Sequence, residues 1–482
     1  MAKRKASTFE RLRQGVMSRK ELQRRLYSAD PGLSVVHPNA AGIDIGNESH
    51  YVAVKPADRD ANPVREFGAW TAALEEMAQW LKACRIDTVV MQSTGVYWMA
   101  AYDILRRHGL DVQLVDARGT KNLPGRKSDV QECQWLMKLH TYGLLRSCFL
   151  PPEQIRQVRT IWRLRQQYVG QAGSSVQHMQ RALIQMNIQL SNTISDLSGV
   201  TGQAIVRAIL DGERDAERLA DLRDRRVKAS LPEIVNSLQG DWKDDIVFEL
   251  RQAVACYDFF QQQIATCDRQ LQQYLATLPA REVAGVSPLA EPCAPKKADK
   301  TRATSRARKP KGNQPAFDLE AELQRILGVN AKTIHGLDVM TIQTVLAEVG
   351  PDLSAWKTEA HWASWLNLAP KRDVSGGKVI RHTREHRTNR VGNAFRLAAQ
   401  ALFRSDTYLG AKFRHLRAKL GAGKAVKAMA RTLACLYYRL VTKGQTWVDR
   451  GTDEFERKRQ ERELTSLQRK ARSLGMQLVP VP

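Results

Sequence analysis

The feature that most constrains the fold of this chain is a run of short apolar segments that alternate with amphipathic ones. The run opens with Ala41-Gly42-Ile43-Asp44-Ile45-Gly46, whose glycines permit tight turns and close backbone approach. Short hydrophobic strands separated by helices predict an α/β sheet covered on both faces, here within residues 38–150. We expect strands at Tyr51–Val54, Thr88–Gln92 and Asp111–Val115, and helices at Thr71–Ala83 and Trp98–His108.

Asp44 is the residue of the first strand that needs a physical explanation. An ionised carboxylate in an apolar strand is costly unless it is paired with a cation or holds a metal ion. The alternative is an acid that only caps the end of a strand, and this alternative is favoured for Asp44 considered alone. The metal interpretation therefore depends on acids further along the chain.

A second acid-bearing segment begins at Ser128. This serine and a glutamine three residues later form a capping box, which predicts the start of a helix. Asp129 and Glu132 then lie on one face of its first turn, where the helix dipole alone would favour acids. Combined with Asp44 and with Gln92 at the end of a predicted strand, they form a set of oxygen donors that suits Mg²⁺. Two such ions could clamp the attacking and leaving oxygens of a phosphodiester.

A basic loop immediately precedes this helix. We expect four of its cations to hold phosphates that flank the reacting one. These residues are Arg118, Lys121, Arg126 and Lys127.

Composition and charge point to a polyanionic partner. The chain has 75 Lys and Arg against 50 Asp and Glu, a formal charge of +25, and nucleic acid is the commonest partner of so basic a protein. A membrane surface is the competing polyanion, but there is no apolar run of transmembrane length and no secretory signal. The seven cysteines are scattered and never in CxxC spacing, which argues against a zinc module and fits a reducing cytoplasm.

Composition also divides the rest of the chain. We expect a basic N-terminal arm (1–37), an antiparallel helical pair or coiled-coil arm (151–280), a basic disordered linker (281–316), an all-α basic domain (317–448) and a charged tail (449–482). The helical pair is either a solvated spacer or a dimerisation arm, and we slightly favour dimerisation. The linker is expected to contact phosphates when nucleic acid is bound.

The basic C-terminal domain contains a serine followed by two glycines and a lysine, on a turn where backbone N–H groups can approach a phosphate. In the simpler interpretation this is an ordinary loop that contacts the DNA backbone through its lysine. In the other, the lysine helps to activate a serine that attacks phosphorus. No GxxxxGK[ST] segment occurs, so an ATP-driven mechanism has no support. The residues concerned are Lys371, Arg372, Ser375, Gly376, Gly377 and Lys378.

The order of these motifs resembles that of the DEDD transposases of the IS-one-ten and IS-eleven-eleven insertion-sequence group. The resemblance covers roughly residues 38–150 and 320–445. Its N-terminal motifs are Gly42–Gly46, Ser93–Trp98, Pro124–Val130 and Gln134–Leu136. Its C-terminal motifs are Trp365–Lys371, Ser375–Lys378 and Asn393–Gln400.

This resemblance implies a RuvC-like (RNase H-like) N-terminal domain that binds Mg²⁺ through four acids, and a C-terminal transposase domain whose serine attacks DNA. Asp44 matches the first acid, Asp129 the third and Ser375 the nucleophile. Gln92 stands where the second acid is expected and removes one charge, whereas Glu132 keeps the charge of the fourth acid on a longer side chain.

The function implied by the resemblance is transposition or site-specific recombination by a bacterial, cytoplasmic, nucleoid-associated enzyme. Donor and target DNA and an element-encoded non-coding guide RNA would be its partners. It would act as a homo-oligomer, a dimer or tetramer, in which the RuvC-like domain of one protomer meets Ser375 of another. Two alternatives remain: a catalytically impaired nucleic-acid-binding descendant, which Gln92 would explain, and a RuvC-like nuclease that hydrolyses branched DNA without a covalent adduct.

Overall fold

The structure is a computed structural model that describes residues 32–55, 62–93, 95–116, 128–282, 312–375, 378–383, 389–444, 451–477 and 479. The chain divides into two compact units, Met1–Leu150 and Pro151–Pro482. Residues 1–31 of the predicted arm, the basic loop at 117–127 and residues 283–311 of the predicted linker lie outside the described residues.

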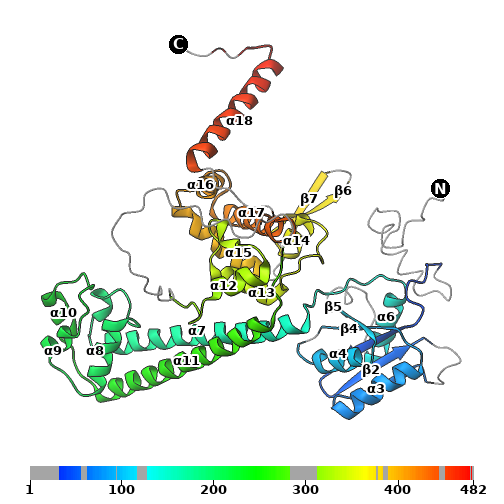
Figure 1. Cartoon of the computed structure of the whole chain (residues 1–482), viewed down its shortest axis with the longest axis horizontal. Helices are drawn as coiled ribbons and strands as arrows, with labels where there is room; N and C mark the ends of the chain where they lie inside the picture. The colour runs from blue at the N-terminus through cyan, green and yellow to red at the C-terminus, as the bar shows by residue number, and fades with distance from the viewer. Residues whose placement is uncertain are drawn as a thin grey trace. The chain divides into compact units, whose positions relative to one another are not determined.

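The first unit contains a mixed sheet of five strands in the order β3-β2-β1-β4-β5 (Figure 1). β1 pairs with β2 antiparallel and with β4 parallel, β2 pairs with β3 antiparallel, and β4 pairs with β5 parallel. β1 is therefore an inner strand with partners on both sides. The strands are β1 (Ala40–Ile45), β2 (Ser49–Val54), β3 (Val64–Gly68), β4 (Thr88–Gln92) and β5 (Asp111–Val115).

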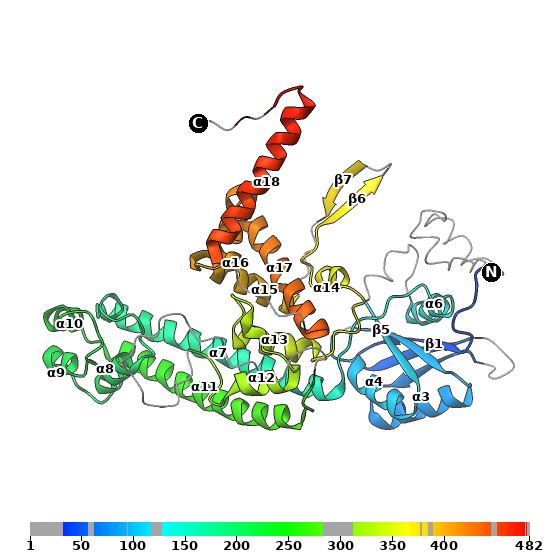
Figure 2. The ribbon, with the colours of Figure 1, turned by 45° about the horizontal axis from the view of Figure 1, so that its top comes forward.

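Helices cover both faces of this sheet, as the sequence predicts (Figure 2). On one face, Ile43 and Met91 pack in a core with Leu74 and Met77 of α3 and with residues of α4. On the other face, Val90 packs with residues of β5 and α6. The helices are α3 (Thr71–Ala83), α4 (Trp98–Arg107) and α6 (Asp129–Thr141). The two helices expected between the strands are confirmed.

Gly42 explains how closely α6 approaches the sheet. A Cβ atom on Gly42 would lie 2.3 Å from the backbone nitrogen of Met137 and 2.4 Å from the carbonyl oxygen of Cys133, both in α6. Any side chain here would push the helix off β1. Side chains alternate between the two faces of a strand, so Asp44, two residues after Gly42, lies on the same face and points toward α6.

We expect Gly42→Ala to weaken the packing of α6 on β1, because the added methyl meets backbone atoms that cannot rotate away. Overpacking of this kind costs about 1–3 kcal/mol, or roughly 10- to 100-fold in local opening. Hydrogen exchange of the β1 and α6 amides in the full chain measures this change. The control is Gly173→Ala in the interior of α7, where a Cβ meets nothing within 4 Å and alanine should increase protection. Unchanged protection of α6 would show that the helix is not seated as described.

The second unit begins with two long helices, α7 (Glu153–Gln185) and α11 (Asp244–Thr277), that lie side by side (Figure 1). Arg165 pairs with Asp268 and Arg181 with Glu249, so the two helices run antiparallel, as predicted. The end of the pair carries a core that includes Leu183, and that core is completed by three short helices. These are α8 (Val200–Leu210), α9 (Ala216–Asp221) and α10 (Leu231–Leu238).

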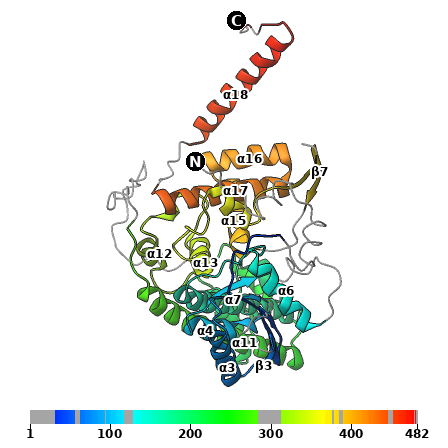
Figure 3. The same cartoon turned by 90° about the vertical axis from the view of Figure 1, so that its right-hand side faces the viewer.

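The remainder of the second unit is mainly helical around a core that includes Trp362, Phe395 and Tyr437, all at most 1% exposed. α18 packs its base on α16 and extends beyond it (Figure 3). The helices are α12 (Leu319–Leu327), α13 (Val339–Val349), α14 (Glu359–Trp365), α15 (Arg390–Ala401), α16 (Tyr408–Leu420), α17 (Ala422–Lys443) and α18 (Gly451–Ser473). Among the described residues, no helix combines the length and apolarity that crossing a bilayer requires.

The expectation of a wholly helical C-terminal domain is wrong at one point. β6 (Lys371–Ser375) and β7 (Lys378–Thr383) form a two-stranded antiparallel hairpin. Both strands are rich in Lys, Arg and other polar residues, so they lack the apolar alternation that identifies a strand in sequence. The sequence signal is the Gly-Gly pair between them, which is typical of a two-residue hairpin connection.

The helical pair is joined to α13 through a buried acid. Glu348 is 6% exposed, and its carboxylate accepts hydrogen bonds from Nε and a terminal nitrogen of Arg163 at 2.8 and 2.6 Å. Arg159 lies 3.3 Å from the same carboxylate, and the Trp162 indole donates to Thr344 at 3.2 Å. One face of α7 therefore belongs to the core of the C-terminal part.

Candidate catalytic site

Two of the predicted residues lie at the carboxyl ends of neighbouring parallel strands. The β1–β4 register pairs Ile43 with Met91, so Asp44 and Gln92 each follow by one residue. Gln92 is 3% exposed, and Asp44 is half-buried. Residues that are adjacent across a sheet point to the same face, so both side chains are directed toward the side that α6 covers.

The first turn of α6 brings the other two predicted residues to this face. Ser128 caps the helix by accepting a hydrogen bond from the backbone N–H of Gln131 at 3.4 Å, which confirms the predicted helix start. Glu132 is half-buried, and its Oε1 accepts a hydrogen bond of 2.5 Å from Nε2 of Gln92. Asp129 is exposed at the start of the same turn.

Cys133 shows that Asp44 and Asp129 are close to a common point. Burial and, to a smaller extent, the charges of Asp44 and Asp129 raise the pKa of the Cys133 thiol to about 12. Both carboxylates therefore lie within electrostatic reach of this one sulfur. A thiol with so high a pKa stays protonated at neutral pH, so Cys133 fills space beneath the site and is not a nucleophile.

The donor set fits a hard cation. Asp44, Asp129 and Glu132 offer only oxygen atoms, the ligands that Mg²⁺ prefers, and no thiolate or imidazole stands among them. The structure does not draw them into a ready cluster, since the described ranges contain no group of three His, Cys, Asp or Glu that could hold a metal ion. Gln92 instead occupies one Glu132 oxygen with its amide N–H.

Tyr51 and Glu66 lie across the sheet from Asp44, in the same line of cross-strand neighbours. The sequence analysis did not identify them as site residues. Tyr51 pairs with Asp44 across β1 and β2, and Glu66 pairs with Tyr51 across β2 and β3. Glu66 accepts a hydrogen bond from the Ser49 hydroxyl at 2.5 Å. Glu66 also accepts one from the Tyr51 phenol, which raises the pKa of Tyr51. The available signal was the strand alternation at Tyr51, but β3 itself was not predicted.

Ser375 lies at the tip of the β6–β7 hairpin. The register pairs Ser375 directly with Lys378, so only Gly376 and Gly377 separate the two strands. The Asn389 side chain donates to the carbonyl of Trp365 at 3.1 Å, a contact between two residues that flank the hairpin in the chain. The serine is thus carried at the end of a two-stranded hairpin.

Several predicted nucleic-acid ligands lie beyond what the structure describes. Arg118, Lys121, Arg126, Lys127, Gly376 and Gly377 are outside the described residues. Lys371, Arg372, Ser375 and Lys378 are placed by their backbone in the hairpin. Their roles stay predictions.

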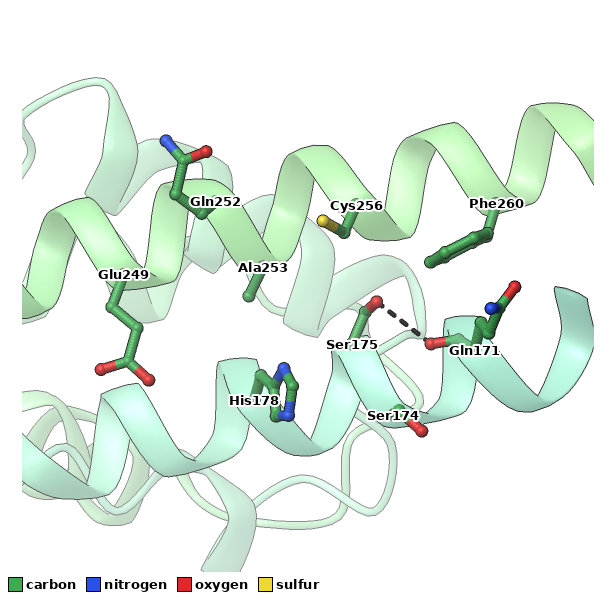
Figure 4. A pocket seen from close by; sticks show the side chains of 9 residues that line it. All are labelled: Gln171, Ser174, Ser175, His178, Glu249, Gln252, Ala253, Cys256 and Phe260. Atoms are coloured by element: carbon green, nitrogen blue, oxygen red, sulfur yellow. Dashed lines mark hydrogen bonds between the residues drawn. The ribbon is translucent and has the colours of Figure 1, made fainter.

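A cavity of about 310 Å³ lies elsewhere, between α7 and α11 (Figure 4). Its lining includes Ser175, His178, Glu249, Cys256 and Phe260, and the Ser175 hydroxyl donates to the carbonyl of Gln171 within α7. Glu249 is already paired with Arg181. None of the residues predicted for chemistry lines this cavity.

Comparison with known families identifies the chain. The model of the DEDD transposases of IS110, described as "Transposase", matches residues 41–188 and so contains Asp44, Gln92, Asp129 and Glu132. The model described as "Transposase IS116/IS110/IS902 family" matches residues 329–414, which contain Ser375. A search of curated proteins found no match. The two models match in chain order, over residues 41–188 and 329–414, and together they support the assignment of this chain to the IS110 family of insertion-sequence transposases.

Proposed function

We propose that this transposase carries out Mg²⁺-dependent DNA strand transfer with Ser375 as the nucleophile, guided by a non-coding RNA from its own element. The observation that carries the proposal is the position of Asp44 and Gln92 at adjacent strand ends, with Glu132 in contact with Gln92. An acid-bearing inner strand flanked by one antiparallel and one parallel neighbour supports a RuvC-like assignment of the first unit.

Asp44, Asp129 and Glu132 would hold the metal, with Gln92 as a neutral fourth member. When bound, Mg²⁺ would supply positive charge next to the oxygens of the reacting phosphodiester. The chain's own part is to fix these carboxylates on a strand end and a helix start, where the N-terminal dipole favours ionised Asp129 and Glu132.

Ser375 would attack phosphorus through its hydroxyl oxygen, forming a phosphoserine-type linkage while the DNA oxygen leaves. Lys378 occupies the register position opposite Ser375, where Cβ atoms of paired residues lie about 5 Å apart. A lysine at that position can stabilise a deprotonating serine or the phosphate under attack. We infer this role for Lys378 from the pairing of its backbone position with that of Ser375.

The charge of +25 supports a nucleic-acid partner. We propose donor and target DNA and, on the family resemblance alone, a guide RNA. The antiparallel pair of α7 and α11 is the proposed dimerisation arm, whose packing would be coiled-coil in type. We place the enzyme in the bacterial cytoplasm, acting on the nucleoid as a dimer or tetramer.

The proposal is tested with a donor plasmid that carries the element and its flanking non-coding region, together with a target plasmid. Purified protein should exchange strands only when Mg²⁺ and the transcribed non-coding RNA are both present. Strand exchange without added RNA would contradict the proposal that a guide RNA is required. Cleavage without joining, and without protein attached to DNA, would favour the hydrolytic nuclease.

Gln92→Glu is expected to tighten divalent-ion binding about tenfold or more, because it restores one negative charge beside Glu132. Mn²⁺ titration followed by electron paramagnetic resonance measures the affinity, and the plasmid assay measures exchange. A large gain from an inert parent would indicate a non-catalytic descendant, whereas a small gain over an active parent indicates a working glutamine variant. Gln134→Glu, an added charge on an exposed part of the same helix, is the control.

A further inference from the structure

We propose that Tyr51, held by Glu66, is a positioning residue of the metal site, where its phenol oxygen accepts a hydrogen bond from a water molecule on the bound cation. The inference rests on the proposed function, because it requires a cation at Asp44. It adds two residues, from β2 and β3, that neither the sequence motifs nor the family matches assign to the site.

The sheet places Tyr51 next to Asp44 in one continuous row. Glu66, Tyr51, Asp44 and Gln92 occupy successive register positions on β3, β2, β1 and β4. Adjacent positions across a sheet point to one face, and their Cβ atoms lie about 5 Å apart in antiparallel pairs. The Tyr51 ring therefore rises from the same face as the Asp44 carboxylate, while its neighbour Val52 packs into the core of the opposite face.

Hydrogen bonds fix the direction of the phenol. The Glu66 carboxylate accepts a hydrogen bond from the Ser49 hydroxyl at 2.5 Å and another from the Tyr51 hydroxyl, so two donors hold it in place. The hydrogen bond to Glu66 raises the pKa of Tyr51 above its usual value. With its single proton directed to Glu66, the phenol oxygen is left with lone pairs that can accept a hydrogen bond.

Tyr51 also lies on the Asp129 side of the site. The charge of Asp129 acts on the phenol, as it acts on the Cys133 thiol. Gln92 and Glu132 are in contact on the β4 side of Asp44. Around Asp44 the site therefore has an amide–carboxylate contact toward β4 and, toward β2, a phenol within electrostatic reach of Asp129.

The chemistry of Mg²⁺ gives such a phenol a task. The ion keeps several waters when only a few carboxylates bind it, and each water needs an acceptor for its protons. Outer partners of metal sites orient the ligands, and their removal typically weakens metal binding about 10- to 100-fold. A phenol whose own proton is engaged by Glu66 is suited to accept from a metal-bound water.

The simpler interpretation is that Tyr51 merely fills the surface of a strand. It is half-exposed and next to an edge strand, where a tyrosine needs no special role. On that interpretation the ring matters and the hydroxyl does not. Replacement of the hydroxyl alone therefore distinguishes the two interpretations.

The test is Mn²⁺ binding by the full chain without nucleic acid, measured by electron paramagnetic resonance, with Mg²⁺ as competitor. Tyr51→Phe should weaken Mn²⁺ binding about 10- to 100-fold. Glu66→Gln keeps an acceptor oxygen for the phenol and should lose less. Tyr102→Phe is the matched control: it removes the same group from α4, which packs on the opposite face of the sheet.

An affinity of Tyr51→Phe within twofold of the parent would overturn the inference and leave the metal site intact. If the parent binds no Mn²⁺, or if Asp44→Asn binds as well as the parent, the proposed metal site fails and the inference fails with it. Hydrogen exchange of the β1, β2 and β3 amides in each variant confirms that the sheet is unchanged, so that weaker binding reports the missing hydroxyl.

Discussion

Ser375→Ala is expected to abolish strand transfer, with a loss of roughly a thousand-fold or more, because removal of a covalent nucleophile eliminates the intermediate through which both steps pass. The parent protein, denatured during reaction with the donor and target plasmids, should carry a protein–DNA adduct that survives denaturant. Ser375→Ala should carry none. Strand exchange and the amount of protein–DNA adduct are both measured in the same samples.

The control for this experiment is Ser364→Ala, since Ser364 is an exposed serine on α14 in the same part of the chain. It should retain both exchange and adduct. If Ser375→Ala still exchanged strands, the assignment of the nucleophile would be wrong. If it lost exchange and the parent formed no adduct, a hydrolytic or directly transferring mechanism would replace it.

Asp44→Asn is expected to cause the second large loss. The substitution keeps the size and one oxygen of the side chain but removes its charge, at the one acid among the predicted metal residues that a strand carries. Loss of about 4 kcal/mol of transition-state stabilisation corresponds to roughly a thousand-fold in rate. The rate of strand exchange at saturating RNA and a range of Mg²⁺ concentrations measures it.

Asp87→Asn is the matched control, because Asp87 precedes β4 at the opposite end of the strand from Gln92, where it accepts a hydrogen bond from Asn39. It should leave the Mg²⁺ dependence unchanged. Equal losses in both variants would mean that Asp44 acts through the stability of the sheet. An unaffected Asp44→Asn enzyme would remove this residue from the metal site.

The helices and strands that could be predicted are those marked by a pattern within their own short stretch of sequence. The strand Thr88–Gln92 is largely apolar and buried along its length, and α6 begins where Ser128 provides a cap. β3 was missed because Val-Arg-Glu-Phe-Gly is short and mixed, and it is a strand through its pairing with β2. The β6–β7 hairpin was missed for another reason: its strands are polar and lack apolar alternation, although the Gly-Gly pair between them is a local hairpin signal.

The same limit applies to the site. Asp44, Gln92 and Glu132 could be identified because strand ends and a helix start can be located along the chain. That Asp44 and Gln92 are neighbours depends on the β1–β4 register, and the contact of Gln92 with Glu132 depends on the packing of α6 on the sheet, and only the folded chain supplies both. Tyr51 and Glu66 could not be proposed, since each is an ordinary strand residue until β2 is aligned with β1 and β3.

The buried contact between α7 and α13 limits which pieces of such transposases can be exchanged. Glu348 is buried, and its partners Arg159 and Arg163 precede it by 189 and 185 residues. A C-terminal module cut at the start of α12 would leave this acid without its cations, a defect that typically costs about 3–5 kcal/mol. A C-terminal piece that keeps this contact must therefore begin at α7 and include its Arg159 and Arg163, rather than begin in the basic segment before α12.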